Sequence, residues 1–528
     1  MNNNVNCRCA TLIPVLVKEA NSILSQCLHR HVQSHGEDLI KAISILTNLS
    51  QQDSLDSIST NIASAYNTFG NIKFAMNDFE AASSFYEKAF RMRRRVLGKK
   101  HLDTCITAFN LGKSLHSHRK PDRALLYYEI FANTIFTSPE LVNKTTIMML
   151  QKIAWAFHQD RSLKHAKKFY GLALKSAFKV LGDRDENVAR ILNMYGNLWF
   201  EIGRMDRALK CYERSLVVER PQFDDLQIKS SARYLNILTT ISNIAATYEN
   251  MGNLKKSLLC FKKMLTILNS DDSKATVSTS KINTRVAMVL SDMARVHGKL
   301  GQYDIALKTL SEVLEIRRKE YGNQHGLIAS VLNEIGIIHG SQGHTNNALQ
   351  NFEESLTIRR ILNDPESNVS TVLCNIARVH MVMGDTDKAL ARFKQSAEHE
   401  LSKREGNESS TCDESSTDVL FDSLEQTARI LEEDFNDPQE ALKWYNKGID
   451  TIAKEGPDVV PFEVHSRLLG LAGNLYLKLG DSKKAISLFT QTMRVNVAGG
   501  LAFNANIRTT GYETHQVEGD HRPAAAAA

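Results

Sequence analysis

The side chains best suited to bind a metal ion lie near the N-terminus of the 528-residue chain. Cys27, His31 and His35 follow one another at four-residue spacing, which would place one thiol and two imidazole groups on one face of a helix. A structural zinc site needs four protein ligands, and the sequence offers no fourth ligand at a suitable spacing. We therefore predict no metal site and no cofactor.

Two fragments resemble catalytic motifs but are incomplete. Gly112-Lys113-Ser114 matches the end of a phosphate-binding loop, yet Thr107 stands where the first glycine of that motif is required. His399 and Glu400 would begin a zinc-protease helix, but Lys403 replaces its second histidine. The chain has no Gly-x-Ser-x-Gly elbow and no Gly-x-Gly-x-x-Gly turn. We therefore predict that the protein is not an enzyme.

A unit of two amphipathic helices joined by a turn is repeated along most of the chain. Its best-formed copy is Leu192–Leu216, which reads LNMYGNLWFEIGRMDRALKCYERSL. The small residues Gly196 and Ala208 allow two helices to approach closely, while Trp199 and Tyr212 fill the space around the contact. These four residues are predicted to have a packing role.

The same pattern can be followed through ten copies. The position of Ala208 recurs as Ala82, Ala124, Ala166, Ala208, Ser257, Ala306, Ala348, Ala389, Ala441 and Ala485, at intervals of 41 to 52 residues. Four residues later, nine of the ten copies have an aromatic residue. Twelve residues earlier, nine copies have a small residue: Gly70, Gly112, Ala154, Gly196, Ala245, Ala294, Gly336, Ala377 and Gly473, with Arg429 as the exception.

This pattern resembles the tetratricopeptide repeat, in which a small residue and an aromatic residue are followed by alanine and another aromatic residue on the second helix. The period is longer than the usual one of about 34 residues. The longer form, with linkers such as LGKKHLDT (97–104) and LGDRDENV (181–188), is similar to the repeats of kinesin light chains and related cargo adaptors. The resemblance covers residues 55–495. It implies an all-α, right-handed superhelical solenoid of paired antiparallel helices.

The net charge, the cysteines and the apolar segments indicate the partners and the compartment of the protein. The net charge of +6 is small for this length, and no basic stripe is interleaved with aromatic residues, so we predict no nucleic-acid partner. The eight cysteines are scattered, and the apolar patch 11–17 is too short for a secretion signal. No apolar run is long enough to span a bilayer. We therefore predict a cytoplasmic protein with reduced thiols and no membrane insertion.

The repeats and the polar stretches between them predict seven segments. They are a disordered N-terminus (1–10), a capping helix pair or degenerate repeat (11–50), a regular array of four repeats (55–220), four repeats with longer linkers (221–400), an acidic Ser/Thr-rich loop (401–418), two C-terminal repeats (419–496) and a disordered tail (497–528).

The resemblance also implies a ligand-binding surface. In peptide-binding tetratricopeptide domains, exposed positions three before and one after the first small residue line the concave groove. Here these positions include Asn67, Asn71, Lys113, Gln151, Asn193, Asn197, Ser242, Ser291, Arg295, Asn333, Arg378 and Asn474. Asparagine can bond to a peptide backbone and Lys or Arg to a carboxylate, so the set fits an extended, partly acidic segment. The chaperone-tail clamp of this family needs Asn, Lys or Arg in consecutive repeats, whereas Phe109 and Trp155 stand in such slots here.

Basic residues gather at the ends of several second helices, as in RMRRRVLGKK (91–100), Arg317-Arg318-Lys319 and Arg359-Arg360. We predict that these residues interact favourably with the helix dipole. The alternative is that they form a binding patch for a membrane or an acidic partner. The sequence as a whole predicts an adaptor or scaffold that binds extended peptide segments of partner proteins, with cargo adaptation of the kinesin-light-chain kind as the specific form. The alternative is a regulatory subunit that controls a bound enzyme or signalling partner. The oligomeric state stays open.

Overall fold

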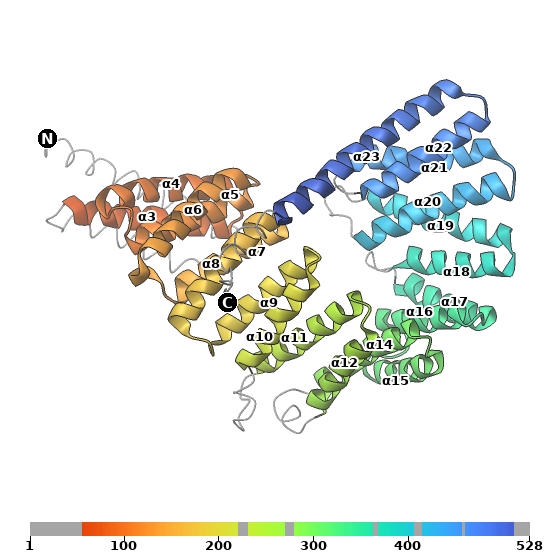
Figure 1. Cartoon of the computed structure of the whole chain (residues 1–528), viewed down its shortest axis with the longest axis horizontal. Coiled ribbons are helices and arrows are strands. Elements are labelled where there is room, and N and C mark those ends of the chain that lie inside the picture. The colour runs from red at the N-terminus through yellow and green to blue at the C-terminus, as the bar shows by residue number, and fades with distance from the viewer. Residues whose placement is uncertain are drawn as a thin grey trace, which may run out of the picture. The chain divides into compact units, whose positions relative to one another are not determined.

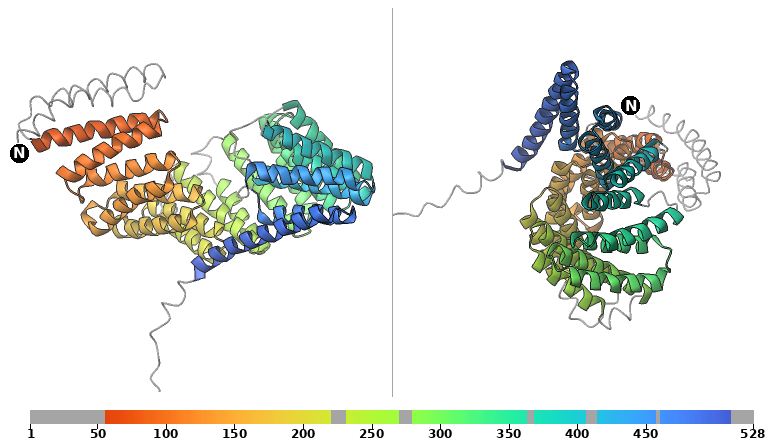
Figure 2. Two further views of the ribbon diagram at one scale, coloured as in Figure 1. Left: turned by 90° about the horizontal axis from the view of Figure 1, so that it is seen from above. Right: turned by 90° about the vertical axis from the view of Figure 1, so that its right-hand side faces the viewer.

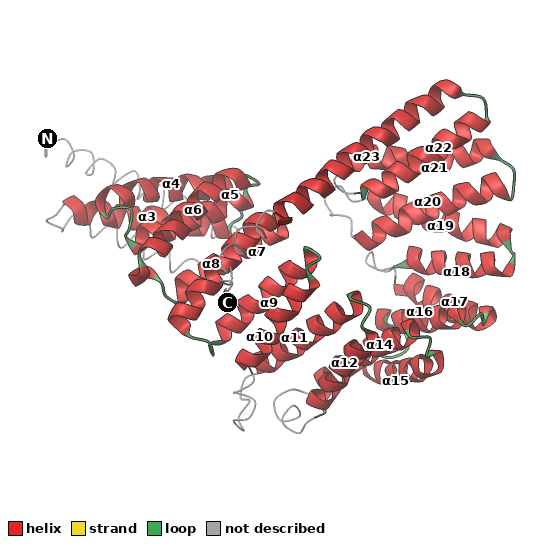
Figure 3. Cartoon of the chain, viewed as in Figure 1, coloured by secondary structure: helices red, strands yellow, loops and turns green. Residues whose placement is uncertain are grey.

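The computed structural model describes residues 55–219, 231–269, 279–362, 368–405, 414–456 and 460–511. These ranges contain twenty α-helices and one short 3-10 helix, and no β-strand occurs in them (Figure 3). The prediction of an all-α array of paired helices is confirmed. The predicted N-terminal segments 1–10 and 11–50, together with Cys27, His31 and His35, lie outside the described residues.

The contacts divide the chain into two compact units, Met1–Ile267 and Leu268–Ala528. In the first unit, successive helix pairs stack side by side in chain order (Figures 1 and 2). Their bounds are α3 (Leu55–Ala75), α4 (Phe79–Val96), α5 (Leu102–Ser117), α6 (Pro121–Thr137), η3 (Pro139–Leu141), α7 (Lys144–Gln159), α8 (Leu163–Leu181), α9 (Glu186–Glu201), α10 (Met205–Glu219), α11 (Ser231–Asn250) and α12 (Leu254–Leu268).

Helix pairs also stack side by side in chain order within the second unit (Figure 1). Its helices are α14 (Thr279–Lys299), α15 (Tyr303–Tyr321), α16 (Gly326–Ser341), α17 (Thr345–Leu362), α18 (Val369–Met383), α19 (Thr386–Glu405), α20 (Glu414–Glu433), α21 (Pro438–Glu455), α22 (Phe462–Lys478) and α23 (Ser482–Gly511). None of the described helices is long and apolar enough to cross a membrane.

Two predicted boundaries are wrong. Helix occupies both ends of the predicted loop 401–418, because α19 continues to Glu405 and α20 begins at Glu414. Helix α23 continues to Gly511, well into the predicted disordered tail 497–528. The loop was predicted from its polar, Ser/Thr-rich composition and the tail from Gly499-Gly500 and its lack of apolar periodicity, but residues such as Lys, Glu, Ala and Leu have a high helix propensity without such periodicity. The remaining residues, 406–413 and 512–528, lie outside the described part of the chain.

The two helices of a repeat meet where a small residue faces an aromatic ring. A Cβ atom added to Gly196 would lie 2.5 Å from Cε1 of Tyr212, and one added to Gly336 would lie 2.6 Å from Cε1 of Phe352. The position of Ala208 has no exposed surface in any of the ten copies. Close-packed interiors do not tolerate added atoms at such contacts, so residue size fixes the spacing of the pair.

The turn inside each repeat requires a left-handed backbone. The residue five before the Ala208 position has a positive φ in all ten copies: Asn77, Arg119, Arg161, Gly203, Gly252, Gly301, Gly343, Gly384, Asn436 and Gly480. Gly203 adopts φ 81° and Arg119 adopts φ 57°. For a residue with a Cβ atom this conformation is less favourable by a free energy of about 1 kcal/mol or more, whereas glycine has no such penalty.

The copy in which Arg429 replaces the small residue has a turn of four residues, 434–437, between α20 and α21. The turn of the best-formed copy, 202–204, has three residues. The extra residue moves the small position to Ala428, which is fully buried in one core cluster with Tyr445, while Arg429 is exposed. The apparent exception in the sequence therefore results from a shift by one residue.

Three of the basic residues near the ends of second helices are buried rather than solvated. Arg93, Arg317 and Arg359 all lie eleven residues after the Ala208 position and are 7 to 8% exposed. Arg93 donates to Oγ1 of Thr107 at 2.7 Å and to Oγ of Ser64 at 3.0 Å, which joins α4 to the first helices on both sides. The helix dipole alone therefore does not explain why arginine occupies this position, because the guanidinium of Arg93 connects three helices.

Candidate functional site

We call the surface formed by α3, α5, α7, α9 and α11, and separately by α14, α16, α18, α20 and α22 in the second unit, the first-helix face. All twelve predicted groove residues belong to these helices, and the nine principal ones are Asn67, Asn71, Lys113, Asn193, Asn197, Arg295, Asn333, Arg378 and Asn474. Their side chains range from half-buried (Asn67, Asn193, Asn333) to exposed (the other six). What each side chain contacts decides whether it is available to a ligand.

Several of the predicted amides bond to the next repeat. Asn110 donates to Oδ1 of Asn67 at 3.3 Å, and Asn375 donates to Oδ1 of Asn333 at 3.0 Å. Nδ2 of Asn193 donates to Oγ1 of Thr240. We call these contacts, which join side chains 42 to 47 positions apart, seam bonds. Each uses at least one atom that a peptide backbone would otherwise engage.

Two other predicted asparagines bind a tyrosine of their own repeat. The hydroxyls of Tyr86 and Tyr212 donate to Oδ1 of Asn71 and Asn197, each over 2.8 Å. The amide oxygen of Asn197 also accepts from Nδ2 of Asn243 at 3.0 Å. These amides therefore satisfy buried hydroxyls.

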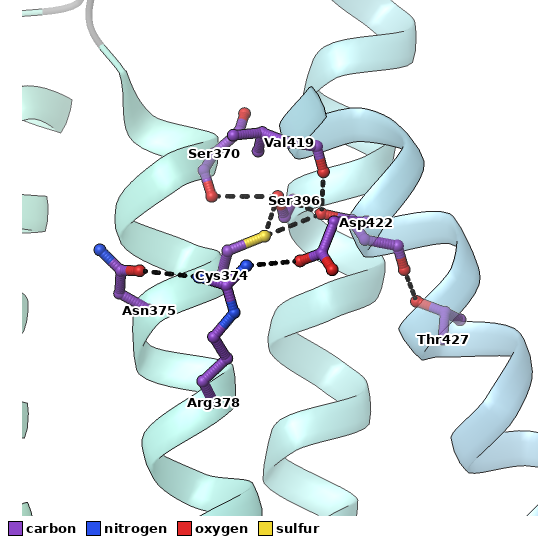
Figure 4. A network of polar contacts seen from close by, with 9 residues as sticks. Ser370, Cys374, Asn375, Arg378, Ser396, Val419, Asp422 and Thr427 are labelled. Carbon is purple, nitrogen blue, oxygen red and sulfur yellow. Dashed lines mark hydrogen bonds and ion pairs between the residues drawn. The ribbon is translucent and has the colours of Figure 1, made fainter. Parts of the chain in front are cut away.

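The predicted arginines of the second unit are ion-paired. Arg378 on α18 lies 2.7 Å from Asp422 on α20 (Figure 4), and Arg295 lies 3.0 Å from Asp292. One turn before Arg378 on the same helix, Cys374 approaches the hydroxyls of Ser423 at 2.9 Å and Ser396 at 3.4 Å (Figure 4). These contacts join α18 to α19 and α20. Burial raises the pKa of the Cys374 thiol, and a thiol with a raised pKa is not an activated nucleophile.

The first-helix face of the first unit contains a pocket of about 540 Å³ between α5, α7 and α9. Its apolar part includes Phe109, Trp155 and Met194, and Lys113 and Lys152 also line it. The indole of Trp155 is 49% exposed, an unusual state for the largest apolar side chain. An exposed aromatic surface next to ammonium groups is suited to bind a segment with apolar and anionic side chains.

The electrostatics of the pocket are predominantly positive. Burial, followed by the nearby charge of Lys152, lowers the pKa of Lys113. The ammonium of Lys113 also lies 4.0 Å from the centre of the Phe74 ring. Nε2 of His116, one turn after Lys113 on α5, lies 2.7 Å from the Asp160 carboxylate, which is already engaged in this contact. An anionic ligand would relieve the repulsion between the two lysines.

Trp155 occupies the slot that Asn71 and Asn197 fill in other copies. As a result, the buried hydroxyl of Tyr170 has no hydrogen-bond partner within the described residues. Leaving a buried hydroxyl unpaired costs about 1 to 3 kcal/mol. The third repeat therefore lacks a stabilising contact at the place where it exposes an indole.

The structure brings only Lys113 and Gln151 of the predicted residues into this pocket. Lys152, Met194, His116 and Asp160 were not predicted, because their approach depends on how successive first helices pack. The departure at Trp155 was a usable signal, since it breaks the repeat pattern with a large apolar residue. Among the described residues, no three His, Cys, Asp or Glu side chains are grouped to hold a metal ion.

The helix pairs and their repeated packing contacts define an α-solenoid. Sequence profiles of the tetratricopeptide repeat match residues 61–129, 285–361 and 468–499. The chain thus contains tetratricopeptide repeats in these three ranges, and arrays of such repeats present extended surfaces for binding. No curated protein matches the sequence significantly.

Several solved structures are similar to this chain at low sequence identity. BtubC (BKLC) from P. vanneervenii is 20% identical, with a TM-score of 0.37 over 47% of this chain and 94% of that one. A putative kinesin light chain with nearly identical TPR-like repeats from Podosopora anserina is 15% identical, with a TM-score of 0.33 over 42% and 98%. Aspartyl phosphate phosphatase F from Bacillus subtilis is 10% identical, with a TM-score of 0.39 over 73% and 93%. At these values the comparison carries no information on binding or activity.

Proposed function

We propose that this protein is a non-enzymatic adaptor that binds an extended, partly acidic segment of a partner protein on its first-helix face. The pocket between α5, α7 and α9 is the principal site in this proposal. An apolar side chain of the segment would lie against Trp155 and Met194, and a carboxylate would pair with Lys113 and Lys152. Cargo adaptation of the kinesin-light-chain kind is the specific form that the repeat length suggests.

The observation that carries the proposal is that Trp155 exposes its indole while the hydroxyl of Tyr170 is left without a hydrogen bond. The third repeat has an exposed indole where two other repeats have an asparagine that satisfies the tyrosine hydroxyl. Local rules of packing are broken most often where function requires it. An exposed tryptophan that costs stability is explained by a ligand that covers it.

The variant Trp155→Asn tests this directly. It would give Tyr170 the partner that Asn197 gives Tyr212, so we expect the third repeat to become more stable by about 1 kcal/mol while peptide binding is lost. Binding would be measured with peptides selected by the wild-type chain from an array of proteome segments. A stabilised variant that still binds these peptides would contradict the site, and loss of binding could not be ascribed to unfolding.

A matched pair of lysines on α7 tests the electrostatic part. Lys152→Gln should weaken acidic peptides about fivefold or more, because a charge-assisted hydrogen bond contributes about 1 kcal/mol or more. Lys144→Gln removes the same charge from the start of the same helix, outside the pocket, and should leave the affinity unchanged. Equal effects of both changes would indicate attraction by net charge alone. A wild-type chain that selects no peptide would contradict the adaptor function as such.

A further inference from the structure

The second helices of the first unit carry an excess of positive charge that the repeat architecture does not require. Helices α4, α6 and α8 together have eleven Lys and Arg residues and four Asp and Glu residues, and α8 has no acidic residue. The corresponding internal helices of the second unit, α15, α17, α19 and α21, have fourteen basic and thirteen acidic residues. Helix dipoles and solvation act equally on both sets, so neither accounts for the difference.

The charges lie on the outward side of these helices. On α4, Lys88, Arg91, Arg94 and Arg95 are exposed, and Lys99 continues the set in the following loop. Relative to the buried Ala208 position, the four α4 residues are six, nine, twelve and thirteen positions further on, which is the opposite side of the helix. We call the exposed basic side chains of α4, α6 and α8 the basic face.

Side-chain contacts make the basic face continuous from helix to helix. The rings of Phe90 on α4 and Tyr127 on α6 are 5.6 Å apart in an edge-to-face arrangement. Burial, followed by the charge of Glu87, raises the pKa of Tyr127, whereas the charges of Arg123, Arg91 and Arg94 oppose that rise, so cations of both helices act on its hydroxyl.

The basic face continues from α6 to α8. Lys168 of α8 lies 2.6 Å from Glu129 of α6, and Lys175 of α8 lies 5.2 Å from the centre of the Phe136 ring. Glu129 is thereby paired, as is Glu87 with Arg91 on α4. Two of the four acids on these helices are thus neutralised within the face itself.

Large apolar side chains project from the same face. Leu126 and Phe136 on α6 are both 58% exposed, between the cations of α4 and those of α8. Exposed apolar groups flanked by Lys and Arg are typical of surfaces that lie on a bilayer, where the cations meet lipid headgroups and the apolar side chains enter the boundary region.

We propose that the basic face docks on a membrane surface rich in anionic lipids, such as phosphatidylserine. The charges are spread over three helices instead of converging on one point, which matches many identical headgroups better than a single phosphate or carboxylate. The peptide pocket lies on the first-helix face, between α5, α7 and α9, and the buried Tyr128 is its only lining residue from the helices of the basic face. Docking of this kind needs no membrane-spanning segment.

The experiment is co-sedimentation of the full chain with phosphatidylcholine vesicles that contain or lack phosphatidylserine. We expect binding only to the anionic vesicles, with an affinity that falls as salt is raised. The triple variant Lys164→Gln, Lys175→Gln and Lys179→Gln should bind about 100-fold more weakly, since each lysine near such a surface contributes about fivefold. The variant Phe136→Ser should reduce the binding that persists at high salt.

The matched control removes three exposed cations from second helices of the other unit, with Lys308→Gln, Arg360→Gln and Lys403→Gln. It changes the net charge equally and should leave vesicle binding unaltered. Circular dichroism would verify that both triple variants are folded. Absence of binding to anionic vesicles, or equal loss in the control, would overturn the proposal. So would binding of duplex DNA or polyglutamate to the basic face without binding of vesicles.

Discussion

The hydroxyl of Tyr212 on α10 donates a hydrogen bond of 2.8 Å to Oδ1 of Asn197 on α9. Tyr86 and Asn71 make the same bond in the first repeat. Burial raises the pKa of Tyr212, so its hydroxyl remains protonated and acts as a donor. The residue after the small position therefore has a structural task in these repeats, besides any contact with a ligand.

This bond predicts a coupling between the two residues. Tyr212→Phe should lower the free energy of opening of α9 and α10 by about 1 kcal/mol, and Asn197→Ala by about 1 to 3 kcal/mol because it leaves a buried hydroxyl unpaired. The double variant should lose less than the sum. Native-state amide hydrogen exchange reports this local quantity, which a global transition of a long array does not. Additive losses would mean that the bond contributes nothing.

Arg93 and its neighbour Arg94 should respond differently to truncation. Arg93→Ala leaves Thr107 and Ser64 without their guanidinium partner, and we expect α4 and α5 to open about 2 to 3 kcal/mol more easily. Arg94 is exposed, so Arg94→Ala should change the free energy of opening by no more than about 0.5 kcal/mol. Hydrogen exchange of the two variants decides the point. Equal effects would restore the helix dipole as the reason for basic residues here.

The left-handed turn position predicts a stabilising change. Arg119 has φ 57°, and Arg119→Gly should remove strain of about 1 kcal/mol. The gain is partly offset because glycine is more flexible in the unfolded chain. Gly203→Ala is the reverse test and should destabilise its turn by a similar amount. Native-state amide hydrogen exchange of the flanking helices would compare them, and easier opening of α5 and α6 in Arg119→Gly would contradict this prediction.

The lowered pKa of Lys113 predicts a pH dependence for acidic ligands. A bound carboxylate favours the charged ammonium and raises its pKa toward or beyond 10.5, so binding takes up a proton wherever free Lys113 is neutral. Affinity should be constant around neutral pH, where the ligand carboxylate is charged, and fall as pH rises through the lowered pKa of Lys113, by at most about tenfold per pH unit. Titrations of a selected peptide at increasing pH would show this. The profile should flatten in Lys113→Gln, and an unchanged profile would place the ligand elsewhere.

The sequence was sufficient for the fold because the packing of each pair depends on residue size at fixed spacing. Ala208, Tyr212 and Gly196 meet as their spacing predicts, and a glycine facing an aromatic ring can be recognised without coordinates. The seam bonds could not be predicted, since they depend on the offset between successive first helices. The pocket depends on the same offset. The one-residue longer turn before α21 was also hidden, because a period count cannot distinguish an added turn residue from a substitution at Arg429.

The seam bonds define what can be exchanged in this array. Because Asn67 is completed by Asn110, and Asn333 by Asn375, the residue choice in one repeat is conditional on the next. A repeat moved to another position would keep its own side chain of each seam bond but lose the partner side chains in the repeats before and after it. A chimaera that keeps its stability must therefore have its crossover points inside repeats, so that each pair of bonded first helices is transferred together. The exchangeable unit of this array is thus the interface between two repeats and not the single repeat.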